Sequence, residues 1–176
     1  MRVIGGELRS RRIKSLPGME MRPTPDRLRE TLFNILAAEI PGTVFLDAYA
    51  GTGAVGIEAL SRGASRAIFL EKHKGAAALI RENLESLGLA TRALVVAGPS
   101  LKELPKHRAN IVFLDPPYPL EEEYAQALES IVSARLVIAQ HSIRFDPGDQ
   151  HATLSRYRKV KQGDNALSFY RLVEPS

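Results

Sequence analysis

The sequence predicts a single α/β domain with a mostly parallel seven-stranded sheet, whose last two strands form an antiparallel hairpin. Apolar runs alternate with segments of helical spacing, which is typical of a parallel sheet with helices on both faces. A glycine-rich turn follows the first of these runs, as in nucleotide-binding βα units. The chain has 176 residues, 44% of them hydrophobic, which is enough for one domain with a sizeable core.

Residues 1–21 are expected to form a basic arm or short β-hairpin ahead of the main domain, residues 22–176. Residues 1–14 carry five basic side chains against Glu7 alone, so they account for the whole formal net charge of +4. A second basic cluster lies in the first strand of the terminal hairpin. Such clusters attract polyanions, so we expect both to bind nucleic-acid phosphates. The residues are Arg2, Arg9, Arg11, Arg12, Lys14, Arg156, Arg158, Lys159 and Lys161.

The elements of the main domain are expected in regular order. A helix should follow Thr24, which can cap it, with Pro25 at its first position. A strand at 44–46 and a helix from 54 flank the glycine turn. A turn over 162–165 joins the last two strands. The remaining strands are expected at about 67–70, 93–97, 110–114, 135–140, 155–160 and 167–173, and the remaining helices at about 74–87 and 121–133.

The glycine turn, residues 47–53, reads D-A-Y-A-G-T-G at the carboxyl end of the first strand. Its glycines let a ligand approach the backbone closely. The segment from Gly51 to Gly56 also matches the dinucleotide motif G-x-G-x-x-G, so NAD is an alternative ligand. Asp47 favours S-adenosylmethionine (SAM), because a carboxylate repels a pyrophosphate and attracts an ammonium group. Glu71, at the end of the second strand, can accept both ribose hydroxyls of either ligand.

A second motif, Asp115-Pro116-Pro117-Tyr118, follows a buried strand that its two prolines end. It should lie at the edge where open α/β sheets bind ligands. Its groups suit a planar ring with an exocyclic amine. Asp115 and the Pro116 carbonyl can accept the amine hydrogens, and Tyr118 can stack on the ring. All four residues are therefore candidate catalytic residues, and a plain strand-ending turn is the alternative.

Composition excludes several classes of protein. The chain contains no cysteine, which rules out disulfides, cysteine-held metal clusters and thiol nucleophiles. Its four histidines lack the spacing of metal ligands, so we expect no metal. It has no run of 18 apolar residues and no apolar signal region at the N-terminus. We therefore expect no contact with a membrane and a cytoplasmic protein, and we expect it to be a monomer.

The two motifs together resemble those of a known superfamily. D-A-Y-A-G-T-G resembles motif I of class I SAM-dependent methyltransferases, and D-P-P-Y resembles the motif that such enzymes use to methylate amino nitrogens. From Met1 to about Leu172 the chain resembles, more narrowly, the RsmD family, which methylates the exocyclic N2 of a guanine in bacterial small-subunit (16S) rRNA. The segments that carry the narrower resemblance are residues 2–6, 22–30, 33–36, 58–64 and 163–170.

The resemblance implies a Rossmann-like class I methyltransferase domain that binds SAM, releases S-adenosyl-L-homocysteine and acts on 16S rRNA or the small ribosomal subunit. Many relatives carry Asp or Asn after the third strand, whereas this chain has Gly98-Pro99-Ser100. Backbone or Ser100 contacts would then hold the adenine. The cofactor-binding residues expected are Asp47, Tyr49, Ala50, Gly51, Thr52, Gly53, Glu71, Lys72, Gly98, Ser100, Arg22 and Thr24.

Other functions are compatible with the same motifs. A DNA adenine-N6 or a protein glutamine-N5 methyltransferase would use the same D-P-P-Y turn. The small chain, without a separate base-recognition domain, disfavours the DNA enzyme, and the basic arm disfavours the protein-modifying enzyme. A non-catalytic nucleic-acid-binding module is a further alternative. It would not need Asp47, Gly51, Gly53, Glu71 and Asp115 together.

Overall fold

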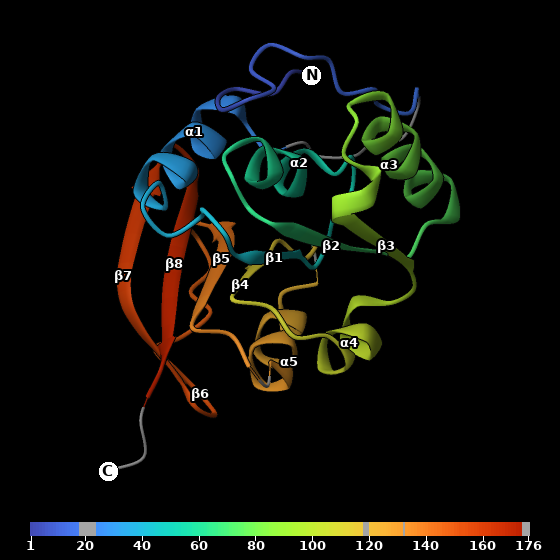
Figure 1. The fold of residues 1–176 in the computed structure, drawn as a ribbon. Coiled ribbons are helices and arrows are strands. Elements are labelled where there is room, and N and C mark those ends of the chain that lie inside the picture. The colour runs from blue at the N-terminus through green and yellow to red at the C-terminus, as the bar shows by residue number, and fades with distance from the viewer. Residues whose placement is uncertain (18–23, 118–119, 132, 174–176) are drawn as a thin grey trace.

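The apolar runs of the sequence form one eight-stranded sheet with the order β3-β2-β1-β4-β5-β8-β7-β6 (Figure 1). The computed structural model describes residues 1–17, 24–117, 120–131 and 133–173. Strands β1 to β5 are parallel, and β8, β7 and β6 continue the sheet in antiparallel pairs. The strands are β1 (Val44–Asp47), β2 (Arg66–Glu71), β3 (Ala93–Ala97), β4 (Ile111–Leu114), β5 (Leu136–Ser142), β6 (Gln150–His151), β7 (Leu154–Gln162) and β8 (Asn165–Leu172).

The fold class expected from the sequence is confirmed, with one addition at the edge. All seven expected strands are present, and β6 adds a two-residue strand that pairs with the start of β7. The terminal hairpin is longer than expected, because Gln162 pairs with Asn165 and only two residues turn between β7 and β8. Strand β1 lies between β2 and β4, so the strand order reverses at this point of the sheet. In open α/β sheets, ligands bind at such a topological switch point, so we expect a ligand site beside the carboxyl end of β1.

Helices cover both faces of the sheet (Figure 1). Helices α1, α2 and α3 lie on one face, and α4 and α5 lie on the other. Among the described residues, no helix has the length and apolar character that a membrane span requires. The helices are α1 (Asp26–Ile35), α2 (Ala54–Ser61), α3 (Lys74–Ser86), α4 (Ser100–Glu103) and α5 (Glu122–Ser130), with the short 3-10 turns η1 (Ala90–Arg92) and η2 (Leu104–Lys106).

Side chains along each strand point alternately to the two faces of the sheet and pack into two hydrophobic cores, one on each face. In β1, Phe45 belongs to the core beneath α1, α2 and α3, and Leu46 belongs to the core beneath α4 and α5. Neighbouring residues of a strand point to opposite faces, so one short apolar run supplies both layers. Helix α2 lies especially close to the sheet, because a Cβ at Gly56 would collide with the ring of Phe69. The glycine turn before α2 is thereby held against the sheet.

Helix α1 starts differently from the prediction. Its first residue is Asp26, and Pro25 occupies the position before it with φ −54° and ψ 139°. No side chain caps the helix, so the expected cap by Thr24 is wrong. The extended ψ of Pro25 places the end of the loop at this residue and leaves Thr24 buried one step outside the helix. Helix α5 also ends at Ser130, earlier than expected.

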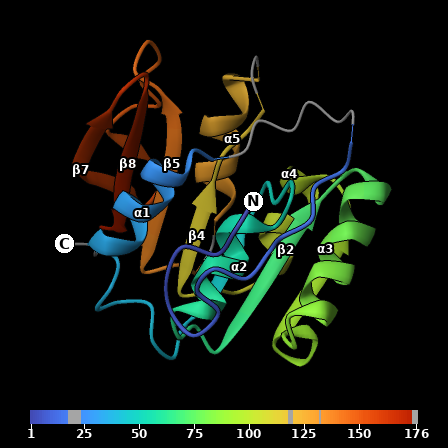
Figure 2. The same cartoon turned by 90° about the horizontal axis from the view of Figure 1, so that it is seen from above.

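The N-terminal arm, of which residues 1–17 are described, crosses α2 and runs beside α3 (Figure 2). Arg2 and Arg12 form an antiparallel bridge, so the arm folds back on itself as a small hairpin. Val3 and Ile13 are 2% and 3% exposed and join the core beneath α1, α2 and α3. The arm is therefore anchored by Val3 and Ile13, with Met1 and Leu8 packed beside them, while its arginines lie at the surface.

A buried carboxylate on α2 holds the backbone of the arm. Glu58, which is fully buried, accepts hydrogen bonds from the amides of Ile4 and Gly5, both at 2.9 Å. It also contacts Arg62, whose Nε lies 2.8 Å away. On the next turn of α2, Ser61 donates to the Gly5 carbonyl and accepts from a further arm amide. A helix side chain thus satisfies backbone groups that a hairpin of this size leaves unpaired.

An arginine on α1 completes this attachment. Arg29 is fully buried, lies 3.7 Å from Glu58 and donates to the Arg2 carbonyl at 2.7 Å. Burial lowers the pKa of Arg29, and the charges of Glu58 and Asp26 oppose that effect. The described parts of segments 2–6, 22–30 and 58–64, which carry the family resemblance in the sequence, therefore meet at one place in the fold.

Candidate active site

The glycine turn lies at the carboxyl end of β1, where Gly51 and Gly53 have φ values of 57° and 82°. Both values are in the left-handed region that glycine adopts without strain. The amide of Gly51 donates to Glu71 Oε2 at 2.8 Å, and the amide of His73 donates to Glu71 Oε1 at 3.1 Å. The carboxylate at the end of β2 is therefore held in place, and each of its oxygens retains capacity to accept a further hydrogen bond.

Asp47 lies beneath this turn rather than facing the open cavity. It is 1% exposed and accepts a hydrogen bond from the Gly56 amide at 3.1 Å. Burial raises the pKa of Asp47 to about 7, and the nearby carboxylates of Asp115 and Glu71 add to that rise. The predicted contact between Asp47 and an ammonium group stays a prediction. The structure adds that the site places three acidic groups close enough to repel one another.

A cavity of about 890 Å³ opens beside the turn. It joins the ends of β1, β2 and β4, and its volume is within the range of small-molecule sites. Predicted site residues line much of one side. They are Tyr49, Gly51, Glu71, Lys72, Ser100, Asp115, Pro116 and Pro117.

Other predicted cofactor residues lie behind the cavity wall. They are not among its lining residues. Thr52, for example, is 7% exposed and donates to the sulfur of Met1. The residues of this kind are Asp47, Ala50, Thr52, Gly53, Gly98 and Thr24. Arg22 and Tyr118 lie outside the described residues.

The loop after β3 is tied to both neighbouring strands. The amide of Gly98 donates to the Glu71 carbonyl at 3.0 Å, and the hydroxyl of Ser100 donates to the Ala48 carbonyl. The Ser100 hydroxyl hydrogen is therefore engaged, and its oxygen can only accept from a ligand. An amine hydrogen of an adenine would suit that acceptor, as the sequence predicted for this loop.

The proline turn brings its carboxylate into the same cavity. Strands β1 and β4 pair in parallel, with Asp47 opposite Phe113, so their carboxyl ends emerge side by side. Asp115, Pro116 and Pro117 follow β4 directly and line the cavity together with Gly51. The Pro117 carbonyl accepts from the Leu120 amide at 2.9 Å, which leads the chain into α5.

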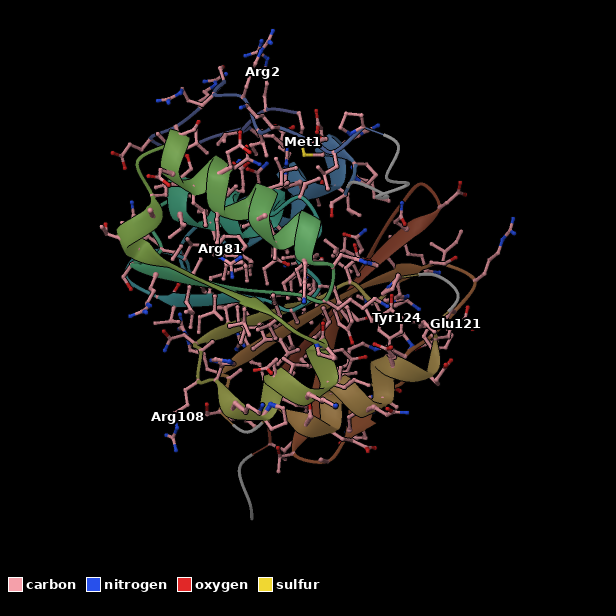
Figure 3. All side chains as sticks on the ribbon, turned by 90° about the vertical axis from the view of Figure 1, so that its right-hand side faces the viewer. Met1, Arg2, Arg81, Arg108, Glu121 and Tyr124 are labelled. Carbon is pink, nitrogen blue, oxygen red and sulfur yellow. The ribbon has the colours of Figure 1, made fainter. Side chains whose placement is uncertain are left out.

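A second wall of the cavity was not predicted from the sequence. It comes from the start of α5, the end of β5 and the start of β8. Tyr49 donates to Glu123 at 2.7 Å, and Tyr124 donates to the Gln140 carbonyl at 2.6 Å. Figure 3 shows Tyr124 and Glu121 near each other at the start of α5. The wall residues are Leu120, Glu121, Glu123, Tyr124, Gln140, His141, Ser142, Phe145 and Asn165.

His141 belongs to this wall, and both of its ring nitrogens have protein partners. Nδ1 lies 2.9 Å from the Ser142 carbonyl, and Nε2 lies 2.8 Å from the Ser168 hydroxyl. Burial lowers the pKa of His141, which favours the neutral ring. The signal for this wall in the sequence is the acidic run 121–123, which begins three residues after the D-P-P-Y turn.

The two predicted basic clusters differ in how their charges are used. The five cations of the arm are exposed, and Figure 3 shows Arg2 pointing away from the body of the protein while Met1 lies against it. In the cluster on β7, Arg156 pairs with Asp146 at 2.8 Å and with Asp149 at 2.7 Å, and Lys159 lies 3.3 Å from Asp146. RNA binding by either cluster stays a prediction.

No group of three or more histidine, aspartate or glutamate side chains within the described ranges is arranged to hold a metal ion. The cavity lining presents the carboxylates of Glu71, Asp115, Glu121 and Glu123. Such a set of groups can hold hydrogen-bond donors and cations.

Comparison with known proteins places the chain among methyltransferases. The family model described as conserved hypothetical protein 95 matches residues 1–171. Ribosomal RNA small subunit methyltransferase D of Escherichia coli K12 is 35% identical over 178 residues, covering 97% of this chain and 89% of the relative. YlbH of Bacillus subtilis, named as a candidate rRNA methyltransferase, is 31% identical over 183 residues, covering 97% of this chain and 98% of the relative. The solved structure of yhhF from Escherichia coli, named as a candidate methyltransferase, has a TM-score of 0.85 at 32% identity and 99% coverage of both chains.

Proposed function

We propose that this chain, which belongs to the RsmD family described as conserved hypothetical protein 95, transfers a methyl group from SAM to the exocyclic N2 amine of a guanine in 16S rRNA. The names of the relatives support rRNA as the substrate, and the Escherichia coli name supports the small subunit. The partner is 16S rRNA, free or in an assembling subunit. The protein acts as a monomer in the cytoplasm.

The observation that carries this proposal is that one cavity contains both motifs. Gly51 and Glu71 line it from the glycine turn and β2, and Asp115 lines it from the proline turn. A cofactor held by the first pair of groups and an amine held by Asp115 would share that cavity. Alignment of two bound reactants contributes about 7–11 kcal/mol to catalysis.

The charge of the site fits a cationic cofactor. Glu71 and Asp115 line the cavity, and both contribute to the raised pKa of Asp47 beneath it. A sulfonium and an ammonium group would relieve the repulsion among these carboxylates. The pyrophosphate of NAD would add to it. SAM therefore fits the described residues better than NAD does.

Each part of SAM has a matching group in the site. Glu71 would accept the ribose hydroxyls, the turn around Gly51 would lie against the amino-acid part, and Ser100 would accept from the adenine amine. When bound, SAM supplies an electrophilic methyl group on its sulfonium. These assignments use the acceptors that the cavity presents and need no side-chain donor.

The acceptor amine is positioned by the proline turn. Asp115 and the Pro116 carbonyl accept its two hydrogens and direct the nitrogen lone pair toward the methyl group. Asp115 then accepts the proton that the methylated nitrogen loses. The guanine must leave its stack to enter the cavity, at a cost of a few kcal/mol. Stacking on Tyr118, which stays a prediction, would offset about 1–3 kcal/mol of that cost.

Methyl transfer from labelled SAM tests the proposal directly. Unmodified small subunits, free 16S rRNA, tRNA and DNA are offered, and the labelled nucleoside is identified by mass spectrometry. We expect N2-methylguanosine in 16S rRNA. Asp115→Asn should lower turnover by about 100-fold or more and leave SAM affinity within a few-fold. The matched control is Asp164→Asn in the exposed hairpin turn. Label on adenine or on protein, or wild-type turnover in the Asp115 variant, would overturn the assignment.

Calorimetric titration at several pH values tests the cofactor. Since the pKa of Asp47 is raised to about 7, a bound cation should favour its ionised form. Affinity for SAM should therefore rise with pH between about 6 and 8. Asp47→Asn should weaken SAM binding and remove that part of the pH dependence, and NAD should bind negligibly. Unchanged SAM affinity and pH dependence in a folded Asp47→Asn protein would exclude this role.

A further inference from the structure

We infer that Glu123 is a specificity-determining residue that accepts the N1–H of the target guanine and thereby selects guanine over adenine. This inference rests on the proposed function and goes beyond it, since the D-P-P-Y turn by itself serves either base. It is carried by where Glu123 lies, by what holds it and by the hydrogen-bonding groups that the base presents.

Glu123 lies in the acceptor half of the cavity. It is in the first turn of α5, which follows the proline turn, and it lines the same cavity as Asp115 and Pro116. Its side chain is partly buried, whereas Glu122 beside it is exposed and does not line the cavity. Of these two neighbouring glutamates, only Glu123 can meet a base that Asp115 holds.

Tyr49 fixes the direction of this carboxylate. Its hydroxyl donates to Glu123 Oε2 at 2.7 Å, across the cavity wall from the glycine turn to α5. Burial and the neighbouring charge of Glu123 both raise the pKa of Tyr49, so the phenol stays protonated and remains a donor. None of the salt bridges found between described residues involves Glu123. The carboxylate is therefore held in one direction by Tyr49, and its oxygens can still accept further hydrogen bonds.

The base edges differ at the position next to the amine. In guanine, the N2 amine has the N1–H donor beside it, so this edge presents donors that two carboxylates can accept. In adenine, the atom beside the N6 amine is N1, which carries a lone pair and no hydrogen. With Asp115 on the amine, Glu123 would accept from guanine N1 and would repel the lone pair of adenine N1. A site achieves specificity most sharply when the wrong partner creates such a clash.

The test uses a base that keeps the amine and lacks the N1 hydrogen. After wild-type enzyme has located its guanine by mass spectrometry, small subunits are assembled with 2-aminopurine at that position. Wild-type kcat/KM for 2-aminopurine should be at least about tenfold lower than for guanine, because a charged acceptor loses its donor. Glu123→Gln keeps the size of the side chain and the bond from Tyr49, but its amide can either donate or accept. This variant should lose about tenfold or more on guanine and should show a guanine preference of only a few-fold.

Matched variants separate selection from support. Tyr49→Phe, which releases Glu123, should shift the preference in the same direction and less strongly. Glu122→Gln should change neither rate nor preference, and SAM affinity should stay within a few-fold in the Glu123→Gln protein. Equal losses on guanine and 2-aminopurine, or no loss on either, would overturn the role of Glu123 while leaving the methyltransferase assignment intact. Absence of any methylated guanine with wild-type enzyme would instead overturn the proposed function.

Discussion

The arm and the β7 strand are both basic in the sequence, but they differ in what their cations contact. The arm is held by buried groups, Glu58 and Arg29, and its own cations lie at the surface, where Lys14 pairs with Glu82 at 2.7 Å. On β7, Arg156 and Lys159 themselves form ion pairs with Asp146 and so hold the loop that carries this residue. The comparison teaches that the number of charges in a segment does not give the charge it can offer a polyanion.

The other two cations of the β7 cluster are used differently again. Arg158 lies on the opposite face of the sheet, 5.9 Å from the ring of Phe169, and Lys161 is exposed near the hairpin turn. A β-bulge between Arg156 and Arg158 shifts the register, and this separates the side chains onto two faces. The four residues therefore do not form one continuous patch.

The largest effect is expected where the arm is attached. Glu58→Ala should lower the free energy of unfolding by about 3–5 kcal/mol, because it removes the buried partner of the Arg29 charge and leaves only the exposed Asp26, 3.2 Å away. It also removes the acceptor of two arm amides. Urea denaturation measures the change, and Glu85→Ala, an exposed site on α3, is the control. Equal stability of the two variants would show that the arm does not depend on this carboxylate.

The next effect concerns RNA binding and contrasts the two regions directly. Replacing Arg9, Arg11 and Arg12 with alanine should weaken binding to 16S rRNA and reduce the slope of log K against log salt by about 0.7–0.9 for each phosphate that the protein no longer neutralises. Replacing Arg156 and Lys159 should reduce it by less than one such step, since Asp146 already neutralises them. Filter binding at several salt concentrations gives both slopes. A larger change from the β7 pair would reverse the comparison.

Deleting the whole arm is a poorer experiment than the triple substitution. Removal of residues 1–14 would expose the core that Val3 and Ile13 cover and would leave Glu58 without the arm amides. Met1 also contacts Thr52 in the glycine turn. The arm therefore contacts the cofactor turn, and unchanged SAM affinity is expected only for the alanine variants.

A smaller effect is expected from the ion pairs of β7. The hydrogen bond from Arg156 is the main cause that lowers the pKa of Asp146 below its ordinary value of 3.8. Folding therefore gains stability from this group above about pH 4, and the gain disappears as the pH falls toward the lowered value. Because Asp146 is half exposed, Asp146→Asn should cost about 1 kcal/mol or less at pH 7. The difference in unfolding free energy between wild type and variant should shrink in acid, and a constant difference would contradict this explanation.

The smallest effect should come from single exposed lysines. Lys161→Ala should leave the unfolding free energy within about 0.5 kcal/mol, as is usual for surface positions. If Lys161 contacts a phosphate, the salt slope falls by about 0.7–0.9, the same step as for one arm arginine. Binding measurements on Lys161→Ala beside Arg12→Ala would show whether the exposed part of β7 contributes as the arm does. An unchanged salt slope for Lys161→Ala would mean that, of the two regions, the arm provides the phosphate contacts.

The strands of the sheet and the two ligand turns were predictable because each rests on local signals. Strand periodicity, the glycines after β1 and the prolines after β4 act within a few residues, and their elements lie within a residue or two of the predicted positions. The two-residue strand β6 has too few residues to show a pattern. The extended ψ of Pro25, which ended the loop one residue later than predicted, depends on contacts that its own sequence does not reveal.

The parts that could not be predicted depend on residues far apart in the chain. Arg29 and Glu58 have the character of solvent-exposed helix residues in the sequence, yet the fold buries them against each other. Arg156 looks available until the loop that carries Asp146 folds beside it. The wall with Glu123 is similar, because Tyr49 reaches it from a position 74 residues earlier. Partners of this kind are set by topology, which propensity and spacing do not encode.

The tight packing of Gly6 against α2 has a further consequence for encounters with RNA. Gly6 has φ 78°, and a Cβ there would collide with the Ser61 carbonyl, so the backbone at this bend has little room to move. Ordering a free backbone costs roughly 1–2 kcal/mol of conformational entropy for each residue. The arm loses this backbone entropy when the protein folds. Binding of its arginines to a polyanion therefore costs little further backbone entropy. Its positive charges are thus presented on a preformed frame, and the RNA surface it suits best is one whose phosphates already have matching spacing.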